Sequence, residues 1–294
     1  MSNAVTAASE TVVIQRISPL REAGALFLRN PTGMIGAALF ALILLATLLG
    51  PVAYDIDPFD IVGAPFSSPD GENWFGTDYL GRDILAGILI GGRATLAVGA
   101  VAAVITLIIG ITIGALSGYF GGMLDSALMK ITEFFQVLPT LLFAMVLVTL
   151  FGASLETITL AIGVVSWTGV ARLTRAEFLR IRELDYVKAA TAAGGSSGYT
   201  ILRVILPNAL PPIIVAAAFA IGIAILFEGG MSFLGLGDPN VMSWGLMIGQ
   251  NRNYALDAWW SVVVPGAAIF LAVLSISLIG DGINDALNPR LRKR

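Results

Sequence analysis

Residues 94–117 read ATLAVGAVAAVITLIIGITIGALS and contain no Asp, Glu, Lys or Arg. A helix of about 20 mostly apolar residues is long enough to cross the hydrocarbon core of a bilayer, which is roughly 30 Å thick. Buried helices of soluble proteins are apolar over shorter stretches, of about 10–14 residues. This run, which stays uncharged as far as Leu124, therefore predicts a membrane-spanning helix.

Further uncharged runs lie on both sides of this one. They cover residues 30–54 (with an apolar core at Gly33–Val52), 134–155, 157–171, 204–227 and 258–280. The run at 157–171 is short, but the helix-forming and charged stretch at 173–182 can prolong it into water. Together the runs predict an all-α polytopic membrane protein with six transmembrane helices. The first run is too long and too far from the start for a cleaved leader, so we expect an uncleaved span.

The composition supports this class and excludes several functions. Of the 294 residues, 56% are hydrophobic and 13% are charged, against about 25% charged in soluble domains. A net charge of −3 gives no indication of a nucleic-acid partner. The absence of Cys and His excludes disulfides, thiolate or imidazole metal sites and a Ser-His-Asp triad. The three lysines, at 130, 188 and 293, follow Met, Val and Arg, so none belongs to a phosphate-binding Gly-Lys loop.

The basic residues predict the orientation, because Lys and Arg concentrate on the cytoplasmic side of a membrane protein. With both termini in the cytoplasm, 14 of the 17 basic residues lie inside: Arg16, Arg21, Arg29, Lys130, Arg172, Arg175, Arg180, Arg182, Lys188, Arg203, Arg290, Arg292, Lys293 and Arg294. Arg82, Arg93 and Arg252 lie outside. The chain then divides into a cytoplasmic tail (1–30), the first span with an external segment (31–93), a transmembrane core (94–280) with a cytoplasmic loop (172–208), and a second cytoplasmic tail (281–294). We expect residues Met1–Glu10 to be disordered.

The external segment Ala53–Gly92 is acidic, which is typical of a solvated cap and also compatible with a docking face for a partner. Glycines recur every four residues at Gly110, Gly114, Gly118 and Gly122, so one face of the second span is smooth and lets another helix approach closely. That helix can belong to the same chain, the interpretation we favour, or to a second subunit. Glu133, Glu156, Glu228 and Asp281 stand at the ends of uncharged runs, and we expect them at the membrane interface.

The loop between the fourth and fifth spans contains a second pattern. Asp185 can cap a short helix that runs through Ala193, and Gly194 with Gly195 can end it, since glycine suits the left-handed C-terminal position. Residues 199–206 predict a further short helix before Pro207 opens the next span. The alanines of the first helix offer a small surface that fits a groove on another protein.

The residues of this loop resemble a known family. Lys188-Ala189-Ala190, three residues, Gly194, nine residues and Val204-Ile-Leu206-Pro207 follow the spacing of the "EAA" loop of ABC-importer permeases, whose pattern is Glu-Ala-Ala, Gly and Ile-x-Leu-Pro. Lys188 and Val204 depart from that pattern. The stretches FGTDYLGRD (75–83), SGYFGG (117–122), SFLGLG (232–237) and GDGINDALNPR (280–290) resemble the C-type permease of dipeptide, oligopeptide and nickel importers.

The resemblance implies a type I ABC importer permease fold with a cytoplasmic coupling helix. It implies a non-catalytic subunit of a bacterial inner membrane, with no cofactor of its own, that forms half of the pathway for peptides or peptide-like solutes. The implied partners are a paralogous permease subunit, two ATPase subunits that bind ATP and Mg, an extracytoplasmic binding protein and membrane lipid. The implied ATPase-coupling residues are Asp185, Lys188, Ala189, Ala190, Gly194, Leu206 and Pro207.

Two other classes of function remain as alternatives. A secondary carrier or channel would work without ATPases, but such carriers typically hold ionisable residues within their spans, and the cores of these runs hold none. A membrane enzyme could use Asp78 and Asp83 as an acid–base pair. A solvated loop with a turn at Gly81 is the simpler interpretation of that stretch.

Overall fold

The computed structural model describes residues 19–287, and these form a long helical bundle. The helices are α1 (Pro19–Arg29), α2 (Pro31–Ala53), α3 (Ile84–Phe120), α4 (Gly122–Val137), α5 (Thr140–Phe151), α6 (Leu155–Val165), α7 (Thr168–Arg182), α8 (Asp185–Ala192), α9 (Ser197–Tyr199), α10 (Leu206–Met231), α11 (Trp244–Asn251) and α12 (Trp260–Leu287). Within residues 19–287 the β-structure amounts to two isolated bridges. Residues Met1–Glu10, Arg16 and the basic residues after 287 lie outside the described part.

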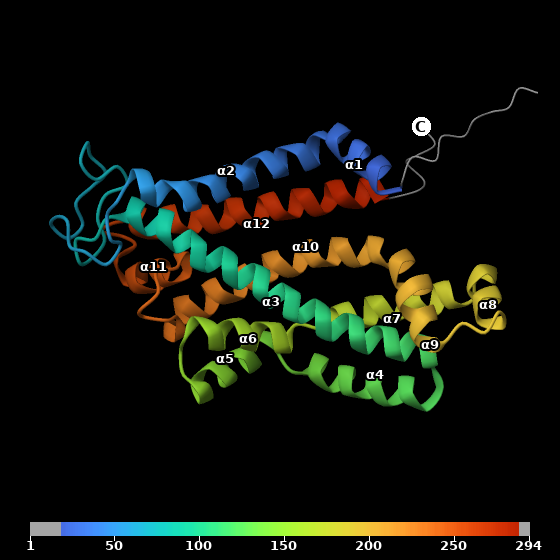
Figure 1. Cartoon of the computed structure of the whole chain (residues 1–294). Coiled ribbons are helices and arrows are strands. Elements are labelled where there is room, and N and C mark those ends of the chain that lie inside the picture. Colours follow the sequence, from blue (N-terminus) through green and yellow to red (C-terminus); the bar gives the residue numbers. More distant parts are fainter. Residues whose placement is uncertain (1–18, 288–294) are drawn as a thin grey trace, which may run out of the picture.

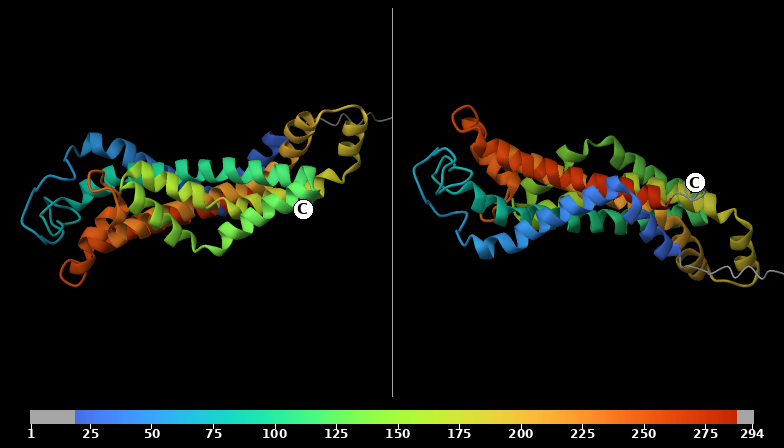
Figure 2. Two further views of the ribbon diagram at one scale, coloured as in Figure 1. Left: turned by 90° about the horizontal axis from the view of Figure 1, so that it is seen from below. Right: turned by 90° about the horizontal axis from the view of Figure 1, so that it is seen from above.

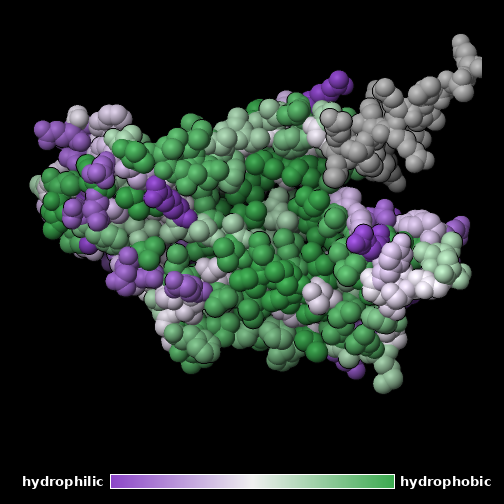
Figure 3. Space-filling model, viewed as in Figure 1, coloured by the Kyte–Doolittle hydropathy of each residue, from purple (hydrophilic) through white to green (hydrophobic). Residues whose placement is uncertain are grey.

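The long helices run side by side along the bundle (Figure 1). The segment between α2 and α3 lies at one end together with α11, and α8 and α9 project at the opposite end (Figures 1 and 2). Hydrophobic residues cover the middle of the visible surface, and hydrophilic residues gather towards both ends (Figure 3). This banded surface is what a bundle surrounded by lipid requires.

The predicted all-α class with six spans is confirmed, although the third span is not straight. Five described helices are long and apolar enough to cross a membrane, and the number is six when α4 and α5, which meet at a bend of 84°, are counted as one broken span. The bend follows from Pro139, which has no backbone N–H and disfavours a helical conformation at the residue before it. Leu138 accordingly adopts an extended conformation, with φ −73° and ψ 127°.

The second span begins ten residues earlier than the uncharged run, so the predicted external segment ends too late. Asp83 accepts a hydrogen bond from the backbone N–H of Ala86 at 2.8 Å and starts α3 there. Arg93 therefore lies in the helix, where its guanidinium donates to the carbonyl oxygens of Thr47 (2.8 Å) and Leu48 (2.9 Å) of α2. Pro51 has no N–H for the Thr47 carbonyl four residues before it, so Arg93 supplies the missing donor.

Asp78 and Asp83 are buried, so the expected solvated loop is wrong for these two carboxylates, although the turn at Gly81 is present with φ 84°. Asp78 accepts hydrogen bonds from the backbone N–H groups of Leu80 (2.8 Å) and Arg82 (2.9 Å), and burial raises its pKa. The hydroxyl of Tyr54 donates to Asp83 at 2.9 Å; burial, together with this bond, raises the pKa of Tyr54 to about 12. Asp78 thus stabilises the turn within the segment, and Asp83 links the start of α3 to the end of α2.

Glu228 is 1% exposed, so the expected interfacial position is wrong for this residue. Its carboxylate accepts hydrogen bonds from the hydroxyls of Ser232 at 2.9 Å and Ser243 at 2.7 Å, which link the end of α10 to the start of α11. The helical path continues beyond Glu228, through Met231 and a π-helical turn at Ser232–Leu236. Glu228 is therefore buried within the bundle, although in the sequence it directly follows an uncharged run.

The predicted glycine stripe faces α7 of the same chain. A Cβ atom at Gly110 would lie 2.6 Å from Cβ of Val170, and one at Gly118 would lie 2.6 Å from Cβ of Phe178. At Gly114 the Cβ atom would collide with the carbonyl oxygen of Ala171. Gly122 is not part of this contact, because it begins α4 with φ 56° and has open space around it. The three glycines let α3 and α7 approach closely.

We predict that Gly114→Ala destabilises the protein by about 1–3 kcal/mol, because the added methyl group overpacks a contact with backbone atoms. Gly266→Ala in α12 is the matched control, since a Cβ atom there meets nothing within 4 Å. It should be neutral or stabilise by about 0.5–1 kcal/mol, as expected of alanine in an open helical position. Thermal unfolding in detergent measures both, and equal midpoints for the two variants would contradict the close α3–α7 approach.

Candidate functional site

Helix α8 is held to the bundle by one buried side chain. Val187 is 2% exposed and belongs to a hydrophobic cluster with Phe178 and Ile181 of α7, Ile205 before α10 and Ala209 of α10. The remaining length of α8 is mostly exposed, including Asp185, Lys188 and Ala189, while Ala190 is half-buried. Helix α8 is thus attached to the bundle through Val187, and its outer surface is exposed to solvent.

Asp185 does not cap α8 as predicted. The N-cap position belongs to Leu184, whose backbone is extended and whose carbonyl accepts from the N–H groups of Val187 (3.0 Å) and Lys188 (3.2 Å). Asp185 is the first residue of the helix, where its negative charge interacts favourably with the helix dipole. The carboxylate was one residue too late in the chain to take the cap position.

The glycines end α8 by a Schellman motif, as the sequence indicated. The N–H of Gly195 donates to the carbonyl of Ala190 at 3.1 Å, and the N–H of Gly194 donates to that of Thr191 at 3.0 Å. Gly194 has φ 87°, a conformation that residues with a side chain adopt only with strain. The motif fixes the direction in which the chain leaves α8.

Lys188 occupies the position at which the EAA pattern has glutamate, and it forms an ion pair. Its Nζ lies 3.2 Å from Oε2 of Glu183, whose other oxygen lies 3.6 Å from Nε of Arg182. The hydrogen bond from Lys188, with the positive charges of both partners, lowers the pKa of Glu183. The pair connects α8 to the end of α7 across the bend between them.

After α8, the chain returns to the bundle along a path that differs from the predicted single helix at 199–206. Helix α9 (Ser197–Tyr199) is followed by a π-helical segment (Thr200–Ile205), and α10 begins at Leu206. Leu206 is partly buried against the same cluster as Val187, and Pro207 follows it in the first turn of α10. Both ends of the loop therefore meet at one cluster.

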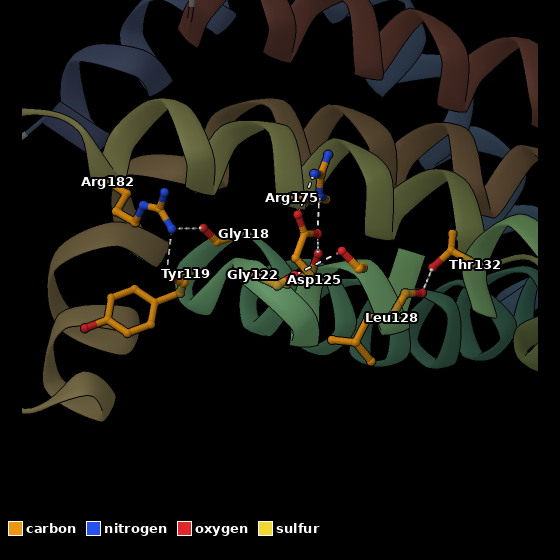
Figure 4. Close-up of polar contacts among 10 residues, drawn as sticks. Gly118, Tyr119, Gly122, Asp125, Leu128, Thr132, Arg175 and Arg182 are labelled. Carbon is orange, nitrogen blue, oxygen red and sulfur yellow. Dashed lines mark hydrogen bonds and ion pairs between the residues drawn. The ribbon is translucent and has the colours of Figure 1, made fainter. Parts of the chain in front are cut away.

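Next to this loop lies a polar cluster that the sequence did not reveal (Figure 4). Arg175 of α7 binds Asp125 of α4 through two hydrogen bonds, of 2.6 and 2.7 Å, and Ser117 of α3 donates to the same carboxylate. Arg182 donates to the carbonyl oxygens of Gly118 (3.2 Å) and Tyr119 (2.9 Å) at the end of α3. The ends of α3, α4 and α7 are thereby tied together beside α8. Among residues 19–287, no three Asp, Glu, His or Cys side chains form a group that could hold a metal ion.

A bundle of apolar helices with an exposed short helix on a polar end defines a polytopic membrane protein. Comparisons with known proteins identify the family to which the chain belongs. Residues 110–293 match the family described as binding-protein-dependent transport system inner membrane component, and residues 18–69 match the N-terminal transmembrane domain of oligopeptide transport permease C. The chain belongs to this family of ABC-importer permeases, which decides against a secondary carrier or channel that works without ATPases.

Individual relatives cover nearly the whole chain. The dipeptide transport system permease protein of Alkalihalophilus pseudofirmus is 36% identical over 278 residues, which is 94% of this chain and 91% of the relative. The probable D,D-dipeptide transport system permease protein of Escherichia coli is 38% identical over 263 residues, covering 89% and 88%. Among solved structures, a chain of the MetNI methionine ABC transporter in an inward-facing conformation has a TM-score of 0.57 at 19% identity, covering 69% of this chain and 96% of that one. This structural match shows a shared fold.

We predict that Lys188→Ala raises the pKa of Glu183 towards the ordinary value for glutamate, because the main cause of its lowering is removed. The pKa of Glu183 is lower in the folded state than in the unfolded state, so the ion pair stabilises the fold at pH values above the ordinary glutamate pKa. This stabilisation is lost as the pH falls through the lowered pKa of Glu183. Carboxyl 13C NMR of labelled Glu183 measures the titration. Lys188→Arg is the control that retains the charge, and an unchanged titration in Lys188→Ala would contradict the ion pair.

Proposed function

We propose that the chain forms half of the pathway of an ATP-driven importer of peptides or peptide-like solutes. Support for the peptide class comes from the relatives, whose names describe dipeptide and D,D-dipeptide transport. A paralogous permease subunit completes the pathway, and an extracytoplasmic binding protein delivers the solute. Two separate ATPase subunits bind ATP and Mg and hydrolyse the nucleotide, and this chain carries no catalytic residue.

The observation that carries the coupling proposal is the position of α8 at the projecting end of the bundle (Figures 1 and 2). Its outer surface presents small side chains, including Ala189 and Ala192, between the larger Tyr186 and Lys188. A helix with small residues fits closely into a groove of another protein. We therefore assign α8, with the flanking coupling residues from Asp185 to Pro207, as the part that binds an ATPase subunit.

Movement of α8 is transmitted to the spans through the buried side chain of Val187. Val187 packs in one cluster with residues of both α7 and α10, so a rigid displacement of α8 displaces the ends of two spans together. The ATPase pair closes when ATP binds, and this motion favours the state in which the pathway opens towards the binding protein. Such coupling requires contacts that differ between the two states of the transporter.

The α8 end faces the cytoplasm in this proposal, and so do both termini. The basic side chains of α7, Arg172, Arg175, Arg180 and Arg182, all stand in the part of the chain that leads to α8, as the positive-inside rule requires. The opposite end, with α11 and the segment between α2 and α3, then meets the binding protein. The membrane is the bacterial inner membrane.

We predict that Ala189→Arg reduces ATP-dependent peptide uptake about tenfold or more, because a long charged side chain prevents α8 from seating in its groove. A loss of about 1.4 kcal/mol of binding energy already corresponds to a factor of ten. Uptake by proteoliposomes that contain the complete complex, together with copurification of the ATPase subunits, measures the effect.

Ser68→Arg is the control, since Ser68 is exposed at the opposite end of the bundle and should leave copurification unchanged. Gly194→Ala tests the same loop without adding charge: it strains the left-handed position and should weaken coupling less than Ala189→Arg. If Ala189→Arg retains both uptake and copurification, the assignment of α8 as the coupling helix is wrong.

A further inference from the structure

The facing sides of α4 and α7 enclose a polar cavity of about 700 Å³. Most of the residues that line it are spaced three or four apart along each helix, which places their side chains on one face of that helix. The two faces therefore meet across the cavity. Its lining consists of Met129, Thr132 and Glu133 of α4 and of Gly169, Arg172, Leu173, Arg175 and Ala176 of α7.

Two side chains of α7 bridge the cavity to α4. Nη1 of Arg172 donates to Oε1 of Gln136 at 2.9 Å, and Arg175 binds Asp125 nearer the end of the bundle (Figure 4). Gln136 follows Glu133 by three positions, so Arg172 reaches the face of α4 that carries Glu133. Arg172 and Glu133 are both exposed, and neither forms an ion pair within residues 19–287. The cavity thus holds two opposite charges that lack ion-pair partners in the described part of the chain.

The cavity lies well inside the membrane-spanning part of the bundle. Gly169 lines it, and the next residue, Val170, packs against α3, where a Cβ atom at Gly110 would lie 2.6 Å from Cβ of Val170. Gly110 stands ten residues before the end of α3, which is about 15 Å along the helix axis. We expected Glu133 at the membrane interface, but the cavity that it lines extends deeper than that.

The charges select the class of occupant. Exposing charged side chains to lipid at this depth is costly, so they face water or a charged partner. An anionic lipid headgroup would bind Arg172 but would be repelled by Glu133. A second permease subunit that covered both charges would have to bury them and supply an opposite charge for each.

A short peptide in a water-filled pathway carries both of the required charges, an ammonium group at one end and a carboxylate at the other. The volume of about 700 Å³ also lies within the range of small-molecule sites, which is about 300–1,000 Å³. The guanidinium of Arg172 has five N–H donors and uses one of them on Gln136, so it can still bind a carboxylate.

We propose that the facing sides of α4 and α7 line the cytoplasmic half of the translocation pathway, where Arg172 binds the C-terminal carboxylate of a short peptide and Glu133 binds its N-terminal ammonium group. The inference rests on the proposed function as a peptide importer. It names the chemical groups of the solute that this chain recognises within the spans.

Equilibrium binding of tritiated trialanine to the complex of permease and ATPase subunits in nanodiscs, without the binding protein, measures this site separately from delivery. We expect Arg172→Gln to weaken the binding of trialanine about tenfold, because a charged hydrogen-bonded pair is lost. The affinity for trialanine amide, which has no C-terminal carboxylate, should stay unchanged in this variant. Glu133→Gln should likewise weaken the binding of trialanine and leave that of N-acetyl-trialanine unchanged.

Lys130→Gln is the matched control, because it removes one positive charge from the exposed surface of α4 at a residue that does not line the cavity. It should bind trialanine as the wild type does. The inference is overturned if the wild type binds no trialanine at millimolar concentration, if Lys130→Gln shows the same loss, or if Arg172→Gln weakens trialanine and its amide equally.

Loss of the second permease subunit during purification of Arg172→Gln or Glu133→Gln would assign the two charges to the subunit interface and would also overturn the inference. ATP-dependent uptake of peptide by the wild-type complex with its binding protein is a separate measurement. Its absence would contradict the proposed function, whatever the result of the binding experiment.

Discussion

The close approach of α3 and α7 is the contact on which the rest of the structure depends. Gly110, Gly114 and Gly118 leave no side chain between the two helices, so the carbonyl oxygen of Ala171 lies directly against α3. This distance allows Arg175 and Arg182 to reach partners at the end of α3 and on α4. In a membrane the hydrophobic effect does not drive apolar helices together, because lipid tails are equally apolar. Close packing and interhelical hydrogen bonds therefore stabilise the association of the helices.

Features that follow from local sequence could be predicted well. Uncharged runs predict spans because the bilayer core excludes charge and requires every backbone group to be paired within the helix. Gly194 and Gly195 predict the end of α8 because few other residues adopt the left-handed conformation that the Schellman motif needs. The glycine stripe predicts a smooth helix face, although the sequence alone left open which helix would use it.

Features that depend on distant parts of the chain could not be predicted. Asp125 and Arg175 are fifty residues apart, and each alone looks like an ordinary charge near the end of a span. Glu228 follows an uncharged run and so resembles an interfacial residue, but its burial is decided by α11, which folds back over it and supplies Ser243. Asp78 and Asp83 are likewise buried by a segment whose path no local pattern describes. The uncharged run at 134–155 likewise did not predict the 84° bend at Pro139, which lies inside that run.

Helix α7 connects the middle of the bundle, at its junction with α6, with the proposed coupling helix. It begins at Thr168 and ends at Arg182, three residues before α8. A helix of 15 residues is about 22 Å long and resists bending, so a shift at one end is delivered to the other. The seam with α3 and the ion pair with α4 prevent α7 from moving alone. A displacement of α8 therefore moves α3, α4 and α7 together, and it also reaches α10, whose residue Ala209 packs in the same cluster as Val187.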